Sequence, residues 1–417
     1  MTENPPLHER RRTMRSAALK VVQCLQAAGH TAYFAGGCVR DMLMGRRPHD
    51  FDVATSALPK QVVELFRRTR QVGAQFGVVL VRIAGYDIEV ATFRADIDYE
   101  DGRHPTHVRF TDAREDAQRR DFTINGMFYD PVSRKVVDYV GGQEDLSAGV
   151  LRAIGEPSQR FEEDHLRILR AIRFSARLGF PIERGTWSAM CASASEIRRI
   201  SPERIREELD KMLTNRNRSQ ACRDLFAAGV VPHLWPRAEV LLPHREAIQG
   251  FVSALPVAAP FELGLAAILH PLSTKQVEAA CLGLRCSNQV KKTVVWLVGL
   301  QDIFLDPSRV TRADLKLLMA HPAFHGLLTL FGSKLRAKGL PPTAHRRIST
   351  RARRIPPEDV APPPWVNGDF LEELKLPKGP AYSAILERVY YAQLNGDLAD
   401  RAAAREYARQ LVAERRG

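Results

Sequence analysis

Two aspartates one residue apart are the first residues whose spacing suits chemistry. Asp50 and Asp52 stand in the segment HDFDVAT, at the start of an expected short strand. Because side chains alternate between the two faces of a strand, both carboxylates point to the same face. Like charges at this spacing repel, and a divalent cation such as Mg²⁺ would offset the repulsion. The alternative is an Asp pair that caps a helix or lies in a turn.

A third carboxylate belongs to Glu89, which stands in DIEVATF within an otherwise apolar expected strand. A solvated charge is out of place in such a run. Three carboxylates on neighbouring strands could hold two metal ions, one activating an attacking hydroxyl and the other stabilising a leaving phosphate. The pattern therefore predicts a two-metal Mg²⁺ site.

The segment upstream of this site suits a phosphate. Gly36 and Gly37 follow an expected strand, TAYFA, and open an expected helix. Backbone N–H groups at such a turn, together with the positive end of the helix, could receive a triphosphate. Arg40 could add charge there, or it could form a surface pair with Asp41.

The elements that position these residues form a small mixed α/β head. VVLVRIA and DIEVATF, on either side of Gly85, predict a β-hairpin. After about residue 150 the strand pattern disappears, and residues 161–177 and 202–213 have helical periodicity. We predict an α+β chain with a catalytic head at 1–150, a helical neck at 151–215, and a helical body and tail at 216–417.

The charge is unevenly distributed. The chain has 417 residues, is 45% hydrophobic and carries a net charge of +13, values that exclude a disordered, collagenous or disulfide-scaffold protein. Residues 1–150 hold 21 basic and 20 acidic side chains, and the remainder holds 40 and 28. A basic body predicts a polyanionic partner, because Lys and Arg neutralise phosphates and release their counterions. A basic proteome would be the alternative explanation.

The cysteine spacing argues against a zinc-binding protein, and the hydropathy pattern argues against a secreted or membrane-spanning one. The six cysteines form no CxxC pair and no zinc-like spacing with His, so we expect reduced core residues. Residues 1–15 have no apolar stretch suited to a signal peptide, and no segment reaches 18 apolar residues. We therefore expect a cytoplasmic protein that does not cross a membrane.

Six motifs follow one another along the first 174 residues: GGCVRD (36–41), DFD (50–52), EVATFR (89–94), RRDFTIN (119–125), DYVGGQEDL (138–146) and EDHLRILRAIRF (163–174). In this order they resemble the class II tRNA nucleotidyltransferases, which comprise the bacterial and eukaryotic CCA-adding enzymes and the bacterial poly(A) polymerases. The resemblance implies a polymerase-beta-like palm in the head and nucleotide transfer from CTP and ATP to the 3′ end of tRNA, with Asp50, Asp52 and Glu89 at the metal site. No protein partner is implied.

The resemblance also implies a nucleotide-binding set. RRDFTIN matches the motif that contacts ribose and phosphates, so we expect Arg120 to contact phosphate or sugar and Asp121 to accept a hydrogen bond from the 2′-OH, with Asn125 beside them. A charged turn that enters a buried strand is the alternative. The whole set predicted to bind the nucleotide is Gly36, Gly37, Arg40, Arg120, Asp121, Asn125, Asp164, Arg167 and Arg170.

Asp164 and Arg167 match the family's base-reading positions. At i,i+3 on a helix they would share a face. A carboxylate accepts from an exocyclic amino group and a guanidinium donates to a ring nitrogen or carbonyl, so the pair would admit cytosine and adenine and reject uracil and guanine. The alternative is an ordinary helix-surface ion pair.

Two polar segments have separate expected roles: the first is a flexible loop of the head, and the second contacts RNA. Residues 94–107 coincide with the family's flexible loop and have no period. Residues 334–354 hold eight Lys/Arg and no acidic residue, followed by the proline-rich stretch 356–364, so we expect a basic loop or linker. The candidates for tRNA contact are Arg346, Arg347, Arg351, Arg353 and Arg354, although a solvated loop would have the same composition.

Three alternatives to a complete CCA-adding enzyme remain open. A poly(A) polymerase shares nearly every motif, but VGAQFGVVLV at residues 72–81 and the DGRHP segment at 101–105 favour the CCA-adding branch. An enzyme that adds only CC or only A has the same motifs. A catalytically silent RNA-binding protein is a further alternative, but it has no reason to keep Asp50 and Asp52 at a metal site.

Overall fold

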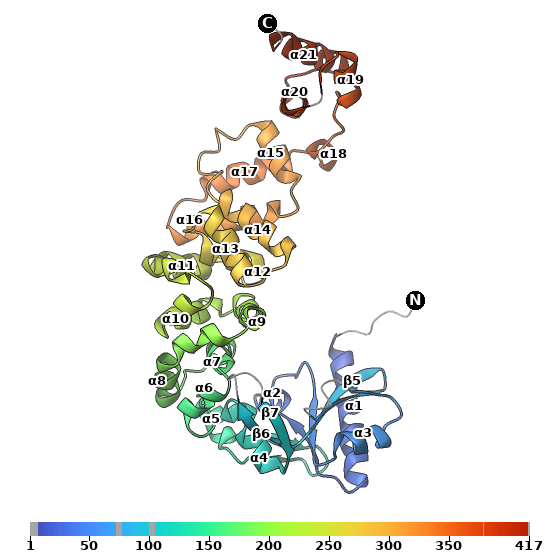
Figure 1. Cartoon of the computed structure of the whole chain (residues 1–417), viewed down its shortest axis with the longest axis vertical. Coiled ribbons are helices and arrows are strands. Elements are labelled where there is room, and N and C mark those ends of the chain that lie inside the picture. Colours follow the sequence, from blue (N-terminus) through green and yellow to red (C-terminus); the bar gives the residue numbers. More distant parts are fainter. Residues whose placement is uncertain (1–6, 72–76, 100–104, 378, 416–417) are drawn as a thin grey trace. The chain divides into compact units, whose positions relative to one another are not determined.

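The chain divides into two compact units. The computed structural model describes residues 7–71, 77–99, 105–377 and 379–415. One unit comprises residues 1–242 and 283–285, and the other residues 243–282 and 286–417. Among the described residues, every strand belongs to the first unit and the second is helical (Figure 1). The expected α+β class is confirmed, and the division into head, neck and body stays a prediction.

A mixed seven-stranded sheet forms the centre of the head, in the order β3-β4-β5-β2-β1-β8-β9. Strands β2 and β5 pair in parallel, and the other neighbours are antiparallel. The expected hairpin is present as β4 and β5, which turn at Ala84 and Gly85, both with positive φ. The strands are β1 (Ala32–Ala35), β2 (Asp52–Thr55), β3 (Thr69–Gln71), β4 (Val78–Ile83), β5 (Tyr86–Thr92), β8 (Phe128–Asp130) and β9 (Lys135–Val137).

Helix α1 (Leu7–Ala27) covers one face of this sheet. Val21 and Leu25, four residues apart and so on one side of the helix, are fully buried with Phe34 of β1 and Val53 of β2. Asp52 and Glu89, two of the carboxylates predicted to form the metal site, lie on the opposite face of the sheet. The other helices of the head are α2 (Gly37–Leu43), α3 (Pro59–Leu65), α4 (Ala113–Gln118) and α5 (Gly142–Ala148), with a 3₁₀ turn at Thr123–Asn125.

The segment expected to be an irregular loop is mostly regular. Residues 94–99 form β6 (Arg94–Tyr99), which pairs antiparallel with β7 (Pro105–Phe110) in a separate two-stranded sheet. The polar composition of this segment predicts no strand, but the backbone hydrogen bonds between the two strands form without an apolar run. Residues 72–76 and 100–104 lie outside the described residues, so most of VGAQFG and DGRHP is not described.

The neck is helical, as predicted, but its central helix is interrupted. The single helix expected over 161–177 breaks at Asp164, which has extended backbone angles and ends α6 (Pro157–Glu163) before α7 (Leu166–Leu178) begins. Helix α9 (Pro202–Leu213) has the predicted bounds, with Pro202 in the first turn, where no N–H is needed. The other helices of this part of the first unit are α8 (Arg184–Ala192), a 3₁₀ helix at Ala194–Arg199, α10 (Arg218–Ala227) and a 3₁₀ turn at Val231–His233.

The second unit is built of helices throughout its described residues. A 3₁₀ helix at Ala238–His244 leads into it. The helices are α11 (Arg245–Ala254), α12 (Phe261–Leu269), α13 (Thr274–Gly283), α14 (Asn288–Gly299), α15 (Arg312–Met319), α16 (Phe324–Ala337), α17 (Thr343–Arg353), α18 (Pro357–Val360), α19 (Gly368–Glu373), α20 (Pro380–Asn395) and α21 (Arg401–Glu414). The last three have their own apolar core, which includes Phe370, Val389 and Leu411.

The basic stretch 334–354 is not the loop that its composition predicted. It spans the end of α16 and all of α17, because Ile348 and Ala352, four residues apart, are buried on one side of α17. Arg351 donates hydrogen bonds to the carbonyls of Pro307 and Val310 and so serves the fold. The other candidates, Arg346, Arg347, Arg353 and Arg354, are exposed, and their contact with RNA stays a prediction.

The state of the cysteines and the lengths of the apolar helices are both predicted from the sequence. All six cysteines are free thiols, with Cys38, Cys222 and Cys281 buried and the others half-buried. Among the described residues, no helix is long and apolar enough to cross a bilayer.

Candidate active site

The turn after β1 is built as the sequence predicts. Gly36 has a φ of 72°, a conformation that favours glycine, and it precedes α2. A Cβ atom at this position would lie 3.1 Å from Nη1 of Arg120, so the close approach of that guanidinium also favours glycine. The backbone turn is thus confirmed, and its contact with a triphosphate stays a prediction.

The three predicted carboxylates share one face of the sheet. Val53 of β2 pairs with Val90 of β5, which brings the preceding residues, Asp52 and Glu89, to the same side, opposite α1. Burial, followed by the charges of Asp50 and Glu89, raises the pKa of Asp52 to about 7, although Arg120 opposes this shift. Burial and Asp50 also raise the pKa of Glu89. The three groups therefore repel one another, and a bound cation would offset this repulsion.

The donor set fits a cation that also takes ligands from its substrate. Within the described parts of the chain, no three His, Cys, Asp or Glu side chains converge closely enough to enclose a metal by themselves. Mg²⁺ is usually bound by one or two carboxylates together with waters and substrate phosphates. Asp50 and Asp52 fit that requirement because both face the large cavity described below, whereas Glu89 does not line it.

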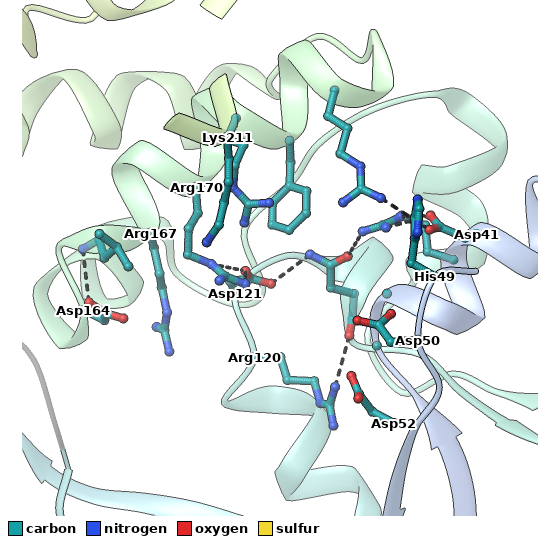
Figure 2. A pocket seen from close by; sticks show the side chains of 18 of the residues that line it. Asp41, His49, Asp50, Asp52, Arg120, Asp121, Asp164, Arg167, Arg170 and Lys211 are labelled. Atoms are coloured by element: carbon teal, nitrogen blue, oxygen red, sulfur yellow. Dashed lines mark hydrogen bonds and ion pairs between the residues drawn. The ribbon is translucent and has the colours of Figure 1, made fainter. Parts of the chain in front are cut away.

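Four of the predicted nucleotide-binding residues form one hydrogen-bonded chain. Arg40 Nη1 donates to Asn125 Oδ1 at 2.6 Å, and Asn125 Nδ2 donates to Asp121 Oδ1 at 3.1 Å. Asp121 Oδ2 then accepts from Arg170 of α7, with Nε at 2.8 Å. Arg40 is 2% exposed and also pairs with Asp41, so it is a buried member of this chain and not a surface charge. The chain links α2 of the head to the neck (Figure 2).

Asp121 is saturated by protein donors in this arrangement. Its Oδ1 accepts from the backbone N–H of Phe122 and from Asn125, while its Oδ2 accepts twice from Arg170. A carboxylate has about four acceptor sites, so a contact with a ribose hydroxyl would require the exchange of one of these bonds. Burial would raise the pKa of Asp121, but Arg170, Asn125 and the backbone together lower it to about 2.

This lowered pKa predicts how Asp121 contributes to stability. We expect Asp121→Asn to lower the free energy of unfolding at pH 7 by about 2 kcal/mol, since one pKa unit corresponds to about 1.4 kcal/mol. A lowered folded-state pKa stabilises above the unfolded value of 3.8, and this is lost as the pH falls through about 2. The difference between wild type and variant is thus constant from pH 7 to about 5 and shrinks below pH 4.

Urea unfolding followed by circular dichroism at pH 7, 5, 4 and 3.5 measures this difference. Asp87→Asn is the control, because Asp87 pairs with Arg82 on the exposed side of the hairpin. That substitution is expected to change stability by less than about 1 kcal/mol. A difference for Asp121→Asn that stays constant between pH 7 and pH 3.5 would contradict the expected linkage.

Asp164 and Arg167 both face the cavity, but they do not share a helix face. Asp164 lies in the break between α6 and α7, whereas Arg167 is in the first turn of α7. Arg167 Nη1 donates to Glu163 Oε2 at 2.7 Å and to the carbonyl of Arg160, and Nη2 donates to the carbonyl of Arg119. Arg167 is therefore paired with Glu163 and Asp164 with Arg204, so the alternative of a surface ion pair between Asp164 and Arg167 is wrong.

One cavity of about 910 Å³ gathers nearly all predicted site residues of the head and neck. Every predicted metal and nucleotide residue except Glu89 lines it, and Figure 2 shows Asp50 and Asp52 beside Arg120, with Asp164 and Arg167 at the other end. The lining has ten Lys or Arg side chains and five Asp. The cavity therefore carries positive charge and suits a polyanion.

Two carboxylates next to the cavity each bind two of the cationic side chains that line it. Asp116 accepts from both Arg119 and Arg120, and Glu208 pairs with both Arg173 and Lys211. Each such trio keeps one uncompensated positive charge. A bound phosphate would balance that charge, so these trios identify where the cavity can receive an anion.

Six cationic side chains that line the cavity are not in the predicted nucleotide-binding set: Arg94, Arg119, Arg173, Arg177, Arg204 and Lys211. Arg173 and Arg177 continue the three- to four-residue spacing of Arg167 and Arg170 along α7, a helical pattern that could have identified them. Arg204 and Lys211 come from α9, and no local pattern predicts that α9 packs beside α7.

Comparison with known proteins identifies the family. A model of the poly(A) polymerase head domain matches residues 32–152, and a model of the probable RNA- and SrmB-binding site of polymerase A matches residues 179–242. The CCA-adding enzyme of Leuconostoc mesenteroides is 34% identical over 404 residues, covering 95% of this chain and 96% of the relative. The chain belongs to the family of CCA-adding enzymes. The predicted family and the nucleotidyltransferase class are thereby confirmed.

Further relatives and solved structures agree with this family. The CCA-adding enzyme of Streptococcus mutans is 33% identical over 400 residues, covering 95% of this chain and 97% of the relative. The structure of the Bacillus stearothermophilus CCA-adding enzyme in complex with CTP has a TM-score of 0.78 and 30% identity, covering 96% of this chain and 99% of the other. The Thermotoga maritima CCA-adding enzyme complexed with tRNA_CCA, at 20% identity, shares the fold with a TM-score of 0.66 over 99% and 100% of the chains. Nucleotidyltransferases of this family typically use a divalent metal.

Proposed function

We propose that this protein adds C, C and A to the 3′ end of tRNA from CTP and ATP, with release of pyrophosphate. The observation that carries the proposal is the single basic cavity in which Asp50 and Asp52 lie at one end and Asp164 and Arg167 at the other. A nucleotide could place its phosphates near the carboxylates and its base near the Asp164 and Arg167 pair. The resemblance to CCA-adding enzymes over nearly the whole chain supports the same proposal.

In the reaction the 3′ hydroxyl of the RNA forms a bond to the α-phosphorus, and the bond from that phosphorus to the bridging oxygen breaks. Asp50 and Asp52 would hold Mg²⁺, with Glu89 as a nearby third carboxylate, and this ion would supply charge neutralisation for the attacking and leaving oxygens. Arg120 and Arg170 are placed to contact the phosphates. Positioning and charge neutralisation carry most of such a reaction, so we assign no general base.

Base choice is assigned to Asp164 and Arg167. Asp164 keeps acceptor capacity on both oxygens, since each oxygen accepts one hydrogen bond, from the N–H of Leu166 and from Arg204. Arg167 keeps its Nε–H and one Nη2–H beyond its three hydrogen bonds. An acceptor beside a donor matches the Watson–Crick edges of cytosine and adenine.

A poly(A) polymerase is the second candidate, because one of the matching family models describes the head domain of such an enzyme. An enzyme that adds only CC or only A would use the same cavity. The silent RNA-binding alternative does not account for three neighbouring carboxylates in the head, where burial and the charge of Asp50 raise the pKa of both Asp52 and Glu89.

An extension assay tests the proposal. We expect the purified protein with Mg²⁺ to extend a tRNA transcript that lacks its 3′ CCA by C, C and A, and then to stop. Each nucleotide is supplied alone and in combination, and products are separated at single-nucleotide resolution. Long oligo(A) products with ATP alone would favour the poly(A) polymerase, and an arrest after CC, or addition of A only to a CC end, would identify a partial enzyme.

A further inference from the structure

The Asp164 carboxylate is held by a cation from another helix. Its Oδ2 accepts from Nη2 of Arg204 at 3.2 Å, while its Oδ1 accepts from the backbone N–H of Leu166 at 3.1 Å. Arg204 stands in the first turn of α9, 40 residues further along the chain. Both side chains are about one-fifth to one-quarter exposed and both line the cavity.

The two base-reading residues differ in how they are fixed. Three acceptors anchor Arg167, and two of them, Glu163 and the carbonyl of Arg160, come from its own segment. Asp164 lies in the extended break after α6, and its carboxylate has one local hydrogen bond, from the backbone N–H of Leu166. Its second oxygen depends on Arg204, so the orientation of the carboxylate is set across two helices.

The packing of α9 does not depend on Arg204. Ile205, Leu209 and Met212 of this helix are buried, and α9 packs mainly against α7. The one hydrogen bond that the Arg204 side chain makes among the described residues is the bond to Asp164. The Arg204 side chain thus lines the cavity and binds Asp164, and it takes no part in the apolar core of the neck.

We propose that Arg204 is a positioning residue for base selection, which holds the Asp164 carboxylate with its remaining acceptor site toward the exocyclic amino group of the incoming base. The inference rests on the proposed function, because it presupposes that Asp164 reads that amino group. A carboxylate with a fixed orientation offers an acceptor where uracil and guanine present a carbonyl, and so rejects them. A carboxylate free to rotate can turn away and tolerate them.

Competition between nucleotides in a single-addition assay tests the role of Arg204. We expect Arg204→Ala to lower the selectivity for CTP over UTP and for ATP over GTP at least about tenfold, the factor for about 1.4 kcal/mol. Arg204→Lys restores part of it, because a single nitrogen of Arg204 contacts Asp164. Arg206→Ala is the matched control on the same helix, since Arg206 donates to the carbonyl of Arg285 and does not line the cavity; its selectivity is expected to equal that of the wild type.

The outcomes distinguish this inference from the proposed function. Equal losses of kcat/KM for all four nucleotides in Arg204→Ala, with wild-type selectivity kept, would overturn the positioning role and leave the proposed function standing. A wild-type protein without preference for CTP and ATP would overturn the proposed function and, with it, this inference. Adding Arg204→Ala to Asp164→Ala is expected to change selectivity no further, whereas additive losses would contradict the positioning role. Thermal midpoints of Arg204→Lys and Arg206→Ala show that the fold is kept.

Discussion

Replacement of Asp52 by Asn is expected to lower the rate of nucleotide addition at least about a thousandfold, with tRNA affinity changed by less than about threefold. The rate falls because Asn has no charge with which to hold the cation, and the loss of about 4 kcal/mol of transition-state stabilisation corresponds to a factor of about a thousand. The affinity is kept because tRNA binding depends on phosphate contacts elsewhere. Single-turnover addition of CTP and a filter-binding titration measure the two quantities.

The thermal stability of Asp52→Asn shows whether its loss of activity comes from unfolding or from the loss of the metal ligand. Burial and two neighbouring carboxylates raise the pKa of Asp52 to about 7, so its ionised form costs folding free energy at pH 8 and its neutral form does not. Asn removes that cost, and the thermal midpoint at pH 8 without metal is expected to be unchanged or higher. Added Mg²⁺ is expected to raise the midpoint of the wild type and not of Asp52→Asn.

A matched control for Asp52 comes from the neighbouring strand. Asp87 of β5 is exposed and pairs with Arg82 at 3.0 Å. Asp87→Asn removes one negative charge from the same sheet and is expected to keep wild-type activity. If Asp52→Asn retained more than a tenth of the wild-type rate, Asp52 would not be a metal ligand.

Replacement of Asp164 by Asn is expected to change which nucleotide is added. An amide can turn its N–H₂ toward the base and donate to the carbonyl of uracil, which an ionised carboxylate cannot do. We expect kcat/KM for CTP to fall about 10- to 100-fold, as for the loss of a hydrogen bond to a charged group worth about 1.5–3 kcal/mol, and the ratio of UTP to CTP addition to rise by a similar factor.

Glu162→Gln is the control for Asp164→Asn. Glu162 is exposed on α6, two residues before Asp164, and does not line the cavity. Its replacement makes the same change from carboxylate to amide in the same segment and is expected to leave selectivity unchanged. If Asp164→Asn kept the wild-type ratio of UTP to CTP, Asp164 would serve the helix break and not the base.

The parts of the fold that could be predicted are those encoded by adjacent residues. The strand before Gly36, the hairpin at Gly85 and helix α9 starting at Pro202 follow from local periodicity and from the backbone preferences of Gly and Pro. The errors fall where tertiary contacts override these preferences. The helix break at Asp164 stands in an otherwise helical pattern, and the basic residues 343–353 form α17 because Ile348 and Ala352 are buried against the second unit's helices.

The sequence by itself determined the chemical groups and their order: the carboxylates at 50, 52 and 89, the glycine turn at 36–37, and a basic excess that lies almost wholly after residue 150. The tertiary structure alone decided which charges meet. Arg40 donates a hydrogen bond to Asn125, 85 positions away, and Arg170 donates one to Asp121, 49 positions away. These residues are predicted to touch the nucleotide, and in the fold they also bind one another. The physical reason is that periodicity records which side of an element is buried, whereas the partner of a buried charge depends on distances between segments remote in the sequence.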